Sequence, residues 1–401
     1  MFRDLMKIKN YKLFLLDMML LGMALAITVP FFILYATQEL GMTRGMYGIM
    51  MALFALAGFL VNTIVARFSD KANFNRKYMI LFSLSMSCIA FSSYFFVQTP
   101  VIFIMMYVFF AGMGAPAMPQ LYASARESIN ESASIKHAAF ANTVLRSMFS
   151  FGFLFGPLVG TVLLKQFGYA GLFGGTILCY LTALLTIIIF YKDVEKKEII
   201  REEGYIEPIT PNLLRDKYLL IPFLAFVFLH VGQWMYTLNM PLFVTEYLHA
   251  KEGNVGYLAS LCAGLEVPFM IILGIMSAKM ETRTLLMIGA VLGGGYYFSI
   301  GVFDNVIAML IGQVGLAFFL AILLGLGISY FQDILPDFPG YASTLFSNAM
   351  IVGQLVGNLL GGFMSDIVGL GNVFFVSASF IAVAFILLIF TKPVRMEDIV
   401  E

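Results

Sequence analysis

The sequence is poor in charged residues. Only 12% of its 401 residues are Asp, Glu, Lys or Arg, about half the share found in soluble domains. A water-soluble globule needs more polar surface than this, so the composition excludes a soluble enzyme and a disordered protein. Lys+Arg and Asp+Glu are equal at 24 each, so no net field favours nucleic acid as a partner.

Cysteine and histidine are scarce and scattered. Cys88, Cys179 and Cys262 lie singly inside apolar stretches, and the three histidines are far apart in sequence. Neither set has the spacing of a metal site or of a disulfide framework. Phosphate-binding loops and dinucleotide fingerprints are also missing from the sequence. We therefore expect no metal, no cofactor and no enzymatic activity.

Long apolar stretches dominate the chain instead. Apolar residues make up 60% of the sequence, and a membrane-spanning helix needs roughly 20 of them. This predicts an all-α polytopic membrane protein embedded in the lipid bilayer. Twelve spans are predicted, at residues 13–36, 45–66, 78–98, 101–125, 138–163, 169–191, 218–245, 254–278, 284–303, 305–331, 341–364 and 371–391.

The distribution of Lys and Arg predicts the orientation. With the N-terminus inside, 20 of the 24 basic residues fall in cytoplasmic segments. The outside loops hold only Arg44, Lys165 and Lys251, and Arg146 lies within a span. Because cytoplasmic loops are enriched in Lys and Arg, both termini are predicted to face the cytoplasm.

One polar, charged loop, residues 192–217, divides the spans into six and six. The predicted domains are an N-terminal half (1–191), a cytoplasmic linker (192–217) and a C-terminal half (218–401). Duplicated halves with a binding site at their interface are a transporter architecture. We expect the chain to function as a monomer.

Two sequence echoes support a duplication. Gly152, Gly156 with Pro157, and Gly160 in span five recur as Gly353, Gly357 and Gly361 in span eleven. Pro30 in span one is echoed by Pro241 in span seven. Glycines four residues apart let helices approach closely in lipid. We expect these glycine faces to pack near their symmetry-related partners in the other half and to act as conformational motifs.

A few ionisable residues lie inside the spans, where charge is costly and usually functional. Glu266 lies near the middle of span eight, where desolvation disfavours the ionised carboxylate; we expect it to carry protons or to bind substrate hydroxyls. Arg146, with Asn142 one turn away, is a candidate for substrate binding, with Glu127 as a possible ionic partner. Glu127 and Asp17 are further candidates for proton coupling, although a structural role for either fits the sequence as well.

Span seven holds the richest polar set, His230, Gln233, Trp234, Tyr236 and Asn239. His230, Gln233 and Trp234 have helical spacing and can share one face. An aromatic ring beside hydrogen-bonding side chains suits a sugar, because its C–H faces stack on rings while its hydroxyls bind amides. Amides in the other spans are expected to line the same cavity, namely Gln120, Gln313, Asn348, Gln354 and Asn358.

The arrangement resembles the major facilitator superfamily over the whole chain. The loop between spans two and three resembles the superfamily's signature at this place. It reads Ala66-Arg67-Phe68-Ser69-Asp70 followed by Arg76-Lys77, with Ala66 in place of the usual glycine. Gly152…Gly156-Pro157…Gly160 resembles the span-five motif of proton-coupled exporters. The resemblance implies the superfamily's two-half fold, with Asp70 and Arg76 in the conformational loop motif.

Four short segments of the sequence are similar to those of the bacterial sugar efflux transporters, a group within that superfamily. They are Ala117-Met118-Pro119-Gln120-Leu121-Tyr122, Asn239-Met240-Pro241-Leu242, Ala263-Gly264-Leu265-Glu266-Val267-Pro268 and Phe331-Gln332-Asp333-Ile334-Leu335-Pro336. The resemblance implies proton-driven export of sugars or glycosides across the bacterial cytoplasmic membrane. In sugar–proton carriers of the superfamily, residues at places comparable to Glu127, Arg146 and Glu266 meet the sugar or the proton. The group's usual pattern has an aspartate at Asn239 and differs at His230 and Trp234, so the particular sugar stays open.

Two other functions fit the same sequence. A proton-driven multidrug exporter would share the span-five motif, and a Met- and Phe-rich interior adapts to many shapes. Sugar–proton symport working as uptake would use the same cavity. The polar set on span seven favours sugars over lipophilic drugs.

Overall fold

The computed structural model describes residues 5–69, 75–131, 138–192, 212–277, 279–336 and 338–391. Within these ranges the regular elements are helices and no strand occurs. Nine of the described helical segments are long and apolar enough to cross a membrane, and α14 (Val373–Ile389) is a shorter apolar helix. The predicted all-α, multi-pass architecture is therefore confirmed.

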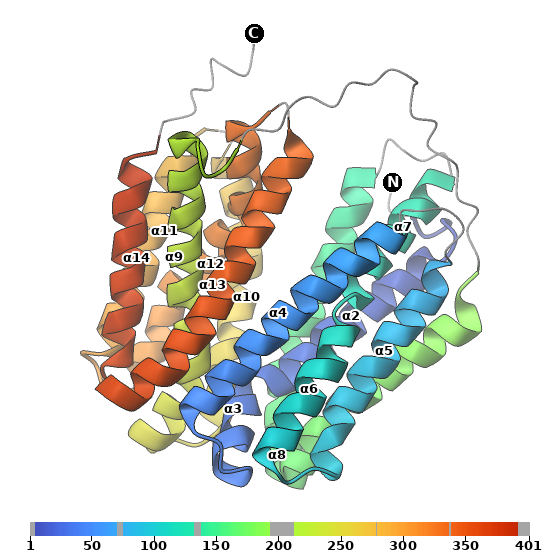
Figure 1. Ribbon diagram of the computed structural model, residues 1–401, viewed down its shortest axis with the longest axis horizontal. Coiled ribbons are helices and arrows are strands. Elements are labelled where there is room, and N and C mark those ends of the chain that lie inside the picture. Colours follow the sequence, from blue (N-terminus) through green and yellow to red (C-terminus); the bar gives the residue numbers. More distant parts are fainter. Residues whose placement is uncertain are drawn as a thin grey trace. The chain divides into compact units, whose positions relative to one another are not determined.

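The chain divides into two compact units (Figure 1). Unit 1 comprises Met1–Gly41 and Leu53–Ile206, and unit 2 comprises Met42–Ala52 and Glu207–Glu401. The helices of unit 1 are α2 (Tyr11–Thr28), α3 (Phe32–Leu34), most of α4 (Arg44–Ser69), α5 (Arg76–Ser92), α6 (Pro100–Gly114), α7 (Ala117–Glu131) and α8 (Ala138–Phe190). Those of unit 2 are α9 (Lys217–Leu242), α10 (Gly253–Met276), α11 (Thr282–Ile300), α12 (Val306–Ile334), α13 (Pro339–Val368) and α14.

The units differ from the predicted halves in one segment. The start of α4, Arg44–Ala52, groups with unit 2, whereas the rest of that helix groups with unit 1. Most of the predicted linker, residues 193–211, lies outside the described residues.

Most predicted span boundaries lie within about three residues of the helices, because apolar run length limits where a helix can leave the bilayer. α8 covers predicted spans five and six and is interrupted at Gly168, whose φ is 63°. Glycine adopts this left-handed conformation without steric cost. Predicted span four is divided into α6 and α7 by a turn at Ala115 and Pro116.

Glycines on α8 allow α2 to pack closely against it inside unit 1. A Cβ added at Gly152 would lie 2.0 Å from the Met19 carbonyl oxygen, and one at Gly156 would lie 2.4 Å from the Cβ of Ala26. Gly160 faces the Ile27 carbonyl in the same way. In a membrane such small-residue contacts replace the hydrophobic effect as the source of helix association.

The glycines of α13 repeat this arrangement on α9 inside unit 2. Gly353 lies against His230, Gly357 against Trp234, and Gly361 against Met235. Both glycine faces therefore contact a helix of their own unit, and the expectation that they also pack near the other half stays a prediction. The spacing of four residues specified a close helix contact, but spacing alone carries no information about the partner.

A further element occurs at equivalent places in both units. The helix that begins with α2 ends in a π-helix at Tyr35–Glu39, and α9 ends in a π-helix at Phe243–Tyr247, 208 residues later. The packing partners Met19 and Val227 differ by the same 208 residues. The proline echo has an offset of 211 residues instead, so Pro30 and Pro241 do not occupy equivalent positions.

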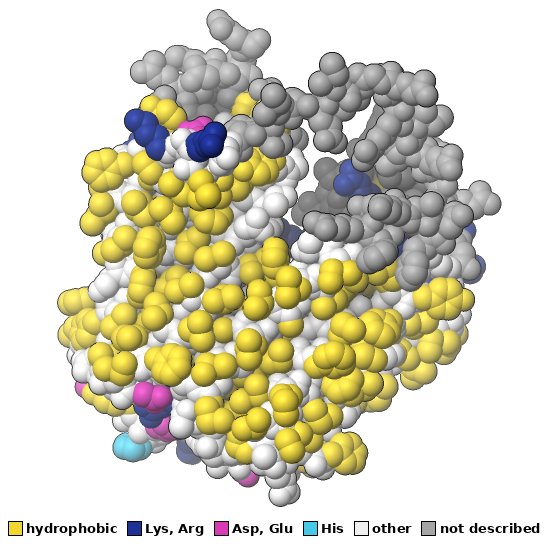
Figure 2. Space-filling view, viewed as in Figure 1, with side chains coloured by type: hydrophobic (Ala, Val, Ile, Leu, Met, Phe, Trp, Pro, Cys, Tyr) yellow, Lys and Arg dark blue, Asp and Glu magenta, His cyan; other side chains and the backbone are white. Residues whose placement is uncertain are grey.

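The helix surfaces carry many exposed apolar side chains. Figure 2 shows hydrophobic side chains spread over much of the visible face, while most of the charged side chains seen there lie toward the top and bottom of the view. Ile64, Ile311 and Phe390 are each more than half exposed. A surface of this kind is suited to lipid rather than water, because patches of this extent are rare on soluble monomers.

Candidate functional site

The polar residues of α9 divide into separate groups rather than one wall. His230 Nδ1 lies 2.8 Å from Gln233 Oε1, so the contact expected from their spacing is present. The His230 ring is fully buried and lies edge-on to Phe346, with a centroid distance of 6.0 Å. Asn239 is on another face, where its amide donates to the carbonyl oxygens of Met235 and Gly361.

Several polar atoms of these α9 side chains are buried without a hydrogen-bond partner in the structure. They are His230 Nε2, Trp234 Nε1 and Asn239 Oδ1. An unsatisfied buried donor or acceptor costs about 1–3 kcal/mol. His230 and Trp234, one helical turn apart, form what we call the α9 polar cluster, and their two buried atoms can gain hydrogen bonds from a polar ligand.

Tyr236 points to a third group, formed with α11 and α12. Its hydroxyl lies 3.2 Å from that of Tyr296, and Gln313 Nε2 donates to Tyr296 at 2.6 Å. The Tyr236 and Tyr297 rings stack with centroids 5.1 Å apart. Gln313 Oε1 and the Tyr297 hydroxyl are buried without partners. We call these four residues the tyrosine–glutamine cluster.

Glu266 is half-buried on α10, one turn after the buried Cys262. Cys262 lies close enough to Glu266, Tyr236 and Tyr296 to interact electrostatically with them. The structure therefore brings three sequence-predicted residues, Glu266, Tyr236 and Gln313, into one region of unit 2.

In unit 1, Asp17 is fully buried on α2. One carboxylate oxygen accepts a hydrogen bond of 2.7 Å from Thr186 of α8, and the other has no partner. Lys12, which the sequence left open as a partner, is exposed. A fully buried carboxyl with one free oxygen is able to take up a proton at little structural cost.

Glu127 and Gln120 of α7 are both bound by Arg76 at the start of α5. Arg76 Nε lies 2.7 Å from Glu127 Oε1, and its Nη1 donates to Gln120 Oε1 at 2.9 Å. The sequence had offered Arg146 as the partner of Glu127. The observed ion pair makes Glu127 part of a contact between α5 and α7.

Arg146 itself is exposed on α8 and acts electrostatically on Tyr122 of α7. The side chains of Asn142 and Asp70 lie outside the described residues. Among the remaining amides, Asn348 and Gln354 are half-buried on α13, while Asn358 is buried with its amide nitrogen unpartnered.

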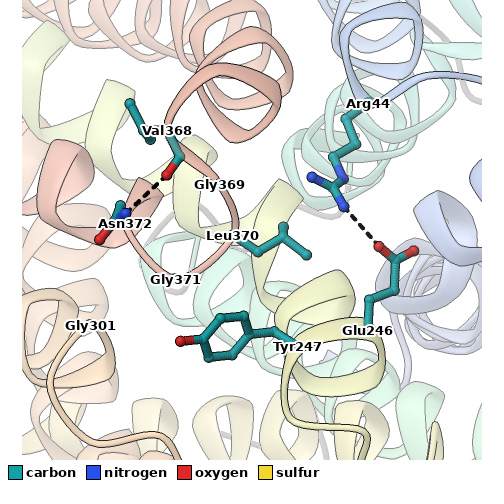
Figure 3. Close-up of a pocket in the computed structure, with 9 residues that line it drawn as sticks. All are labelled: Arg44, Glu246, Tyr247, Gly301, Val368, Gly369, Leu370, Gly371 and Asn372. Carbon is teal, nitrogen blue, oxygen red and sulfur yellow. Dashed lines mark hydrogen bonds and ion pairs between the residues drawn. The ribbon is translucent and has the colours of Figure 1, made fainter.

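Unit 2 also contains a hollow that the sequence did not indicate (Figure 3). Its volume is about 430 Å³, and it is lined by Arg44, Glu246, Tyr247, Gly301 and residues 368–372. Arg44 reaches toward Glu246, and their nearest atoms are 2.9 Å apart. The backbone turn at Gly369, with a φ of 83°, forms one side.

Comparison with known proteins identifies the family. The profile of the Major Facilitator Superfamily matches residues 15–232 and 222–400. The chain belongs to this superfamily. The sugar efflux transporter C of Escherichia coli K12 is 28% identical over 95% of both chains. The sugar efflux transporter B of Salmonella typhimurium LT2 is 29% identical over 88% of both chains.

Solved structures of the superfamily share the fold. The nucleoside transporter NupG superposes with a TM-score of 0.78 over 96% of this chain and 100% of NupG, at 13% identity. A D-xylose–proton symporter superposes with a TM-score of 0.71 over 96% of this chain and 97% of that chain, also at 13% identity. These likenesses confirm the major facilitator fold, in which the sites described above are placed.

Sequence reasoning missed Tyr296, Tyr297, Arg44 and Glu246 in this major facilitator chain. The tyrosines follow three consecutive glycines in an apolar helix, and adjacent phenols within a span were an available signal. Arg44 and Glu246 lie in segments read as ordinary connections, where charge is expected, so the sequence offered no signal for them.

Proposed function

We propose that this chain is a proton-coupled secondary transporter that exports sugars or sugar-like compounds by alternating access. The expected substrates are mono-, di- or oligosaccharides and glycosides. We further propose that it works as a monomer in the bacterial cytoplasmic membrane with both termini inside, as the distribution of Lys and Arg favours.

The observation that carries the proposal is the α9 polar cluster. His230 and Trp234 each present a buried atom with unused hydrogen-bonding capacity. A polyhydroxylated ligand supplies both donors and acceptors, so it can satisfy a mixed set of this kind. The indole ring beside these atoms adds an apolar surface for the C–H face of a sugar ring.

The names of the relatives point the same way. Sugar efflux transporters from Escherichia coli, Salmonella typhimurium and Dickeya chrysanthemi align over 88–96% of this chain. Because the alignments cover both halves, the shared sequence includes α9 and α10. We therefore propose that this chain, like the relatives so named, transports sugars.

For the coupling site we propose Glu266, with Asp17 as a second protonatable group. Glu266 lies near the predicted midplane and one turn after Cys262, which interacts electrostatically with it and with Tyr236 and Tyr296. Asp17 retains an unpartnered oxygen. Glu127 fits this role less well, because its carboxylate is engaged in an ion pair with Arg76. Arg146 is proposed to bind substrate from unit 1.

Counterflow in proteoliposomes tests the substrate class. Purified protein is given a panel of radiolabelled sugars and, in parallel, a lipophilic cation. Accumulation of at least one sugar supports the proposal. Counterflow of the cation with no sugar transported would identify a multidrug exporter instead.

Two Trp234 variants separate stacking from hydrogen bonding. Trp234→Ala removes the ring and should weaken sugar binding by about 1–3 kcal/mol, the range for burying an apolar side chain. Trp234→Phe keeps an aromatic surface but removes the N–H donor, so its loss should be smaller. Unchanged sugar affinity in both variants would exclude Trp234 from the binding site.

A further inference from the structure

The tyrosine–glutamine cluster lies between Glu266 and the helix ends of unit 2 that are predicted to face outside. Tyr297 is close to the end of α11, and Gln313 is close to the start of α12. At about 1.5 Å per residue, Tyr297 is roughly 5 Å and Gln313 roughly 11 Å from these helix ends. Glu266 is deeper, at roughly 20 Å from the outer end of α10. The cluster therefore lies on the outer side of Glu266.

This cluster is separate from the α9 polar cluster. His230 and Trp234 lie against glycines of α13, whereas the Tyr236 hydroxyl meets the polar groups of α11 and α12. The two clusters thus leave α9 toward different helices of the same unit. A proton that moved along the tyrosine–glutamine cluster would not pass the side chains proposed to bind sugar.

The hydrogen bonds inside the cluster leave hydrogens that can be passed on. Gln313 Nε2 donates to the Tyr296 hydroxyl at 2.6 Å and to the Tyr236 hydroxyl at 3.4 Å. These two hydroxyls are 3.2 Å apart, so one of them donates to the other. Each phenol has a single hydrogen, and the hydrogen of the accepting phenol is left over from this pair. The Tyr297 hydroxyl and Gln313 Oε1 are buried without partners in the described structure.

Cys262 connects the cluster to Glu266. It interacts electrostatically with Glu266 and with all three phenols, Tyr236, Tyr296 and Tyr297. Cys262 and Glu266 are four residues apart, so their side chains share one face of α10. Long side chains in a helix lean toward its N-terminus. The Glu266 carboxyl therefore reaches back toward Cys262, on the side where the phenols lie.

We propose that the tyrosine–glutamine cluster conducts protons from the outside to Glu266 along a route that stays within unit 2. A hydroxyl takes a proton on its oxygen and gives its own hydrogen to the next group. Each phenol is therefore unchanged after the transfer, and the Glu266 carboxylate gains one proton. Gln313 carries no proton but holds the phenol oxygens in place. Tyr297 and Gln313 Oε1 supply the polar partners that a connecting water needs.

The inference rests on the proposed function, in which Glu266 is the proton carrier, and it is independent of the substrate. Tyr297→Phe tests it, because this change removes one hydroxyl and no hydrogen bond of the structure. Tyr330→Phe is the matched control. The Tyr330 hydroxyl is also buried without a partner, but it lies near the end of α12 that is predicted to face the cytoplasm.

Both variants are reconstituted into proteoliposomes beside the wild type. The probe is a radiolabelled sugar that shows counterflow with the wild type, or the lipophilic cation if no sugar does. Transport driven by an imposed pH gradient and counterflow are measured on each preparation, and thermal unfolding in detergent checks that each variant is folded.

A positioned proton-transfer group contributes about 10²–10⁴-fold to a rate, but conformational steps limit the turnover of many such cycles. We therefore expect Tyr297→Phe to slow gradient-driven transport by at least about tenfold while counterflow stays unchanged. Tyr330→Phe should leave both activities unchanged. If Tyr297→Phe fails to fold, Tyr296→Phe decides, with rates divided by the amount of folded protein.

Wild-type gradient-driven rates in the folded variant would overturn the path. Equal losses of gradient-driven transport and counterflow would also overturn it and would give the cluster a structural role. An absence of gradient-driven transport in the wild type would overturn proton coupling and the path together. Transport of the cation alone would overturn only the proposed substrate class.

Discussion

Arg76 and Glu127 form an ion pair in which Nε and Oε1 are 2.7 Å apart. The residues 206 positions later, Thr282 and Asp333, are joined by a hydrogen bond of 3.2 Å. The neighbouring Lys77 and Arg283, also 206 positions apart, bind carbonyl oxygens at the ends of α8 and α14. The two units thus make contacts at corresponding positions. Unit 1 has an ion pair, Arg76 with Glu127, where unit 2 has the hydrogen bond between Thr282 and Asp333.

We expect Arg76→Ala to destabilise the protein more than removal of an exposed charge does. Arg76 and Glu127 are only 11% and 23% exposed, and hydrogen bonds to charged groups contribute about 1.5–3 kcal/mol. Thermal unfolding in detergent should show a lower midpoint for Arg76→Ala and for Glu127→Gln, with Lys165→Ala as the exposed control. The double variant should cost less than the sum of the single variants; strict additivity would mean that the pair is not coupled.

The adjacent phenols Tyr296 and Tyr297 should respond in opposite ways to loss of the hydroxyl. Tyr296→Phe removes the acceptor of the 2.6 Å bond from Gln313 and should cost about 1–3 kcal/mol. Tyr297→Phe removes a buried hydroxyl that has no partner, so the unfolding midpoint should stay the same or rise. Both residues are almost fully buried, so equal losses would contradict the assigned hydrogen bonds.

Gly156→Ala should destabilise unit 1, whereas Gly174→Ala should not. A Cβ at Gly156 would lie 2.9 Å from the backbone carbonyl carbon of Ala26, while one at Gly174, on the same helix, would meet nothing within 4 Å. Overpacking of this kind costs about 1–3 kcal/mol. Because the contact lies inside one unit, sugar binding and transport should fall together in the Gly156 variant. A loss of turnover with normal affinity and stability would point to a gating role instead.

The sequence predicted the helices well because their signal is local. Apolar runs of about 20 residues are required by the bilayer, so their ends could be placed close to the observed ones. The interruption of α8 at Gly168 agrees with the sequence as well, because it falls between two predicted spans. The hydrogen bond between His230 and Gln233 could be predicted from helical spacing and is present.

Contacts between helices could not be predicted in the same way. The ion pair of Arg76 with Glu127 was not predicted from the sequence, because it depends on how α5 and α7 pack. His230, Gln233 and Trp234 were expected to share one face of α9. Tyr236 and Asn239 point toward other neighbours, because each residue turns the helix by about 100°. Arg44 contacts Glu246 and Asp366, which lie more than 100 positions away in the sequence, and no local pattern encodes such a contact.

Glu266→Gln should separate proton coupling from substrate exchange. The substitution keeps the size and hydrogen-bonding capacity of the side chain but removes its ionisation, so a proton can no longer be bound and released there. Transport driven by an imposed pH gradient should therefore be abolished, whereas counterflow, which exchanges substrate without net proton movement, should persist. Asp17→Asn is the companion variant in unit 1 and should reduce gradient-driven transport if both carboxyls carry protons. Proteoliposomes with a defined internal pH measure the two activities on one preparation. Wild-type rates for Glu266→Gln on the gradient would exclude it as the carrier, and loss of both activities would make it a substrate ligand instead.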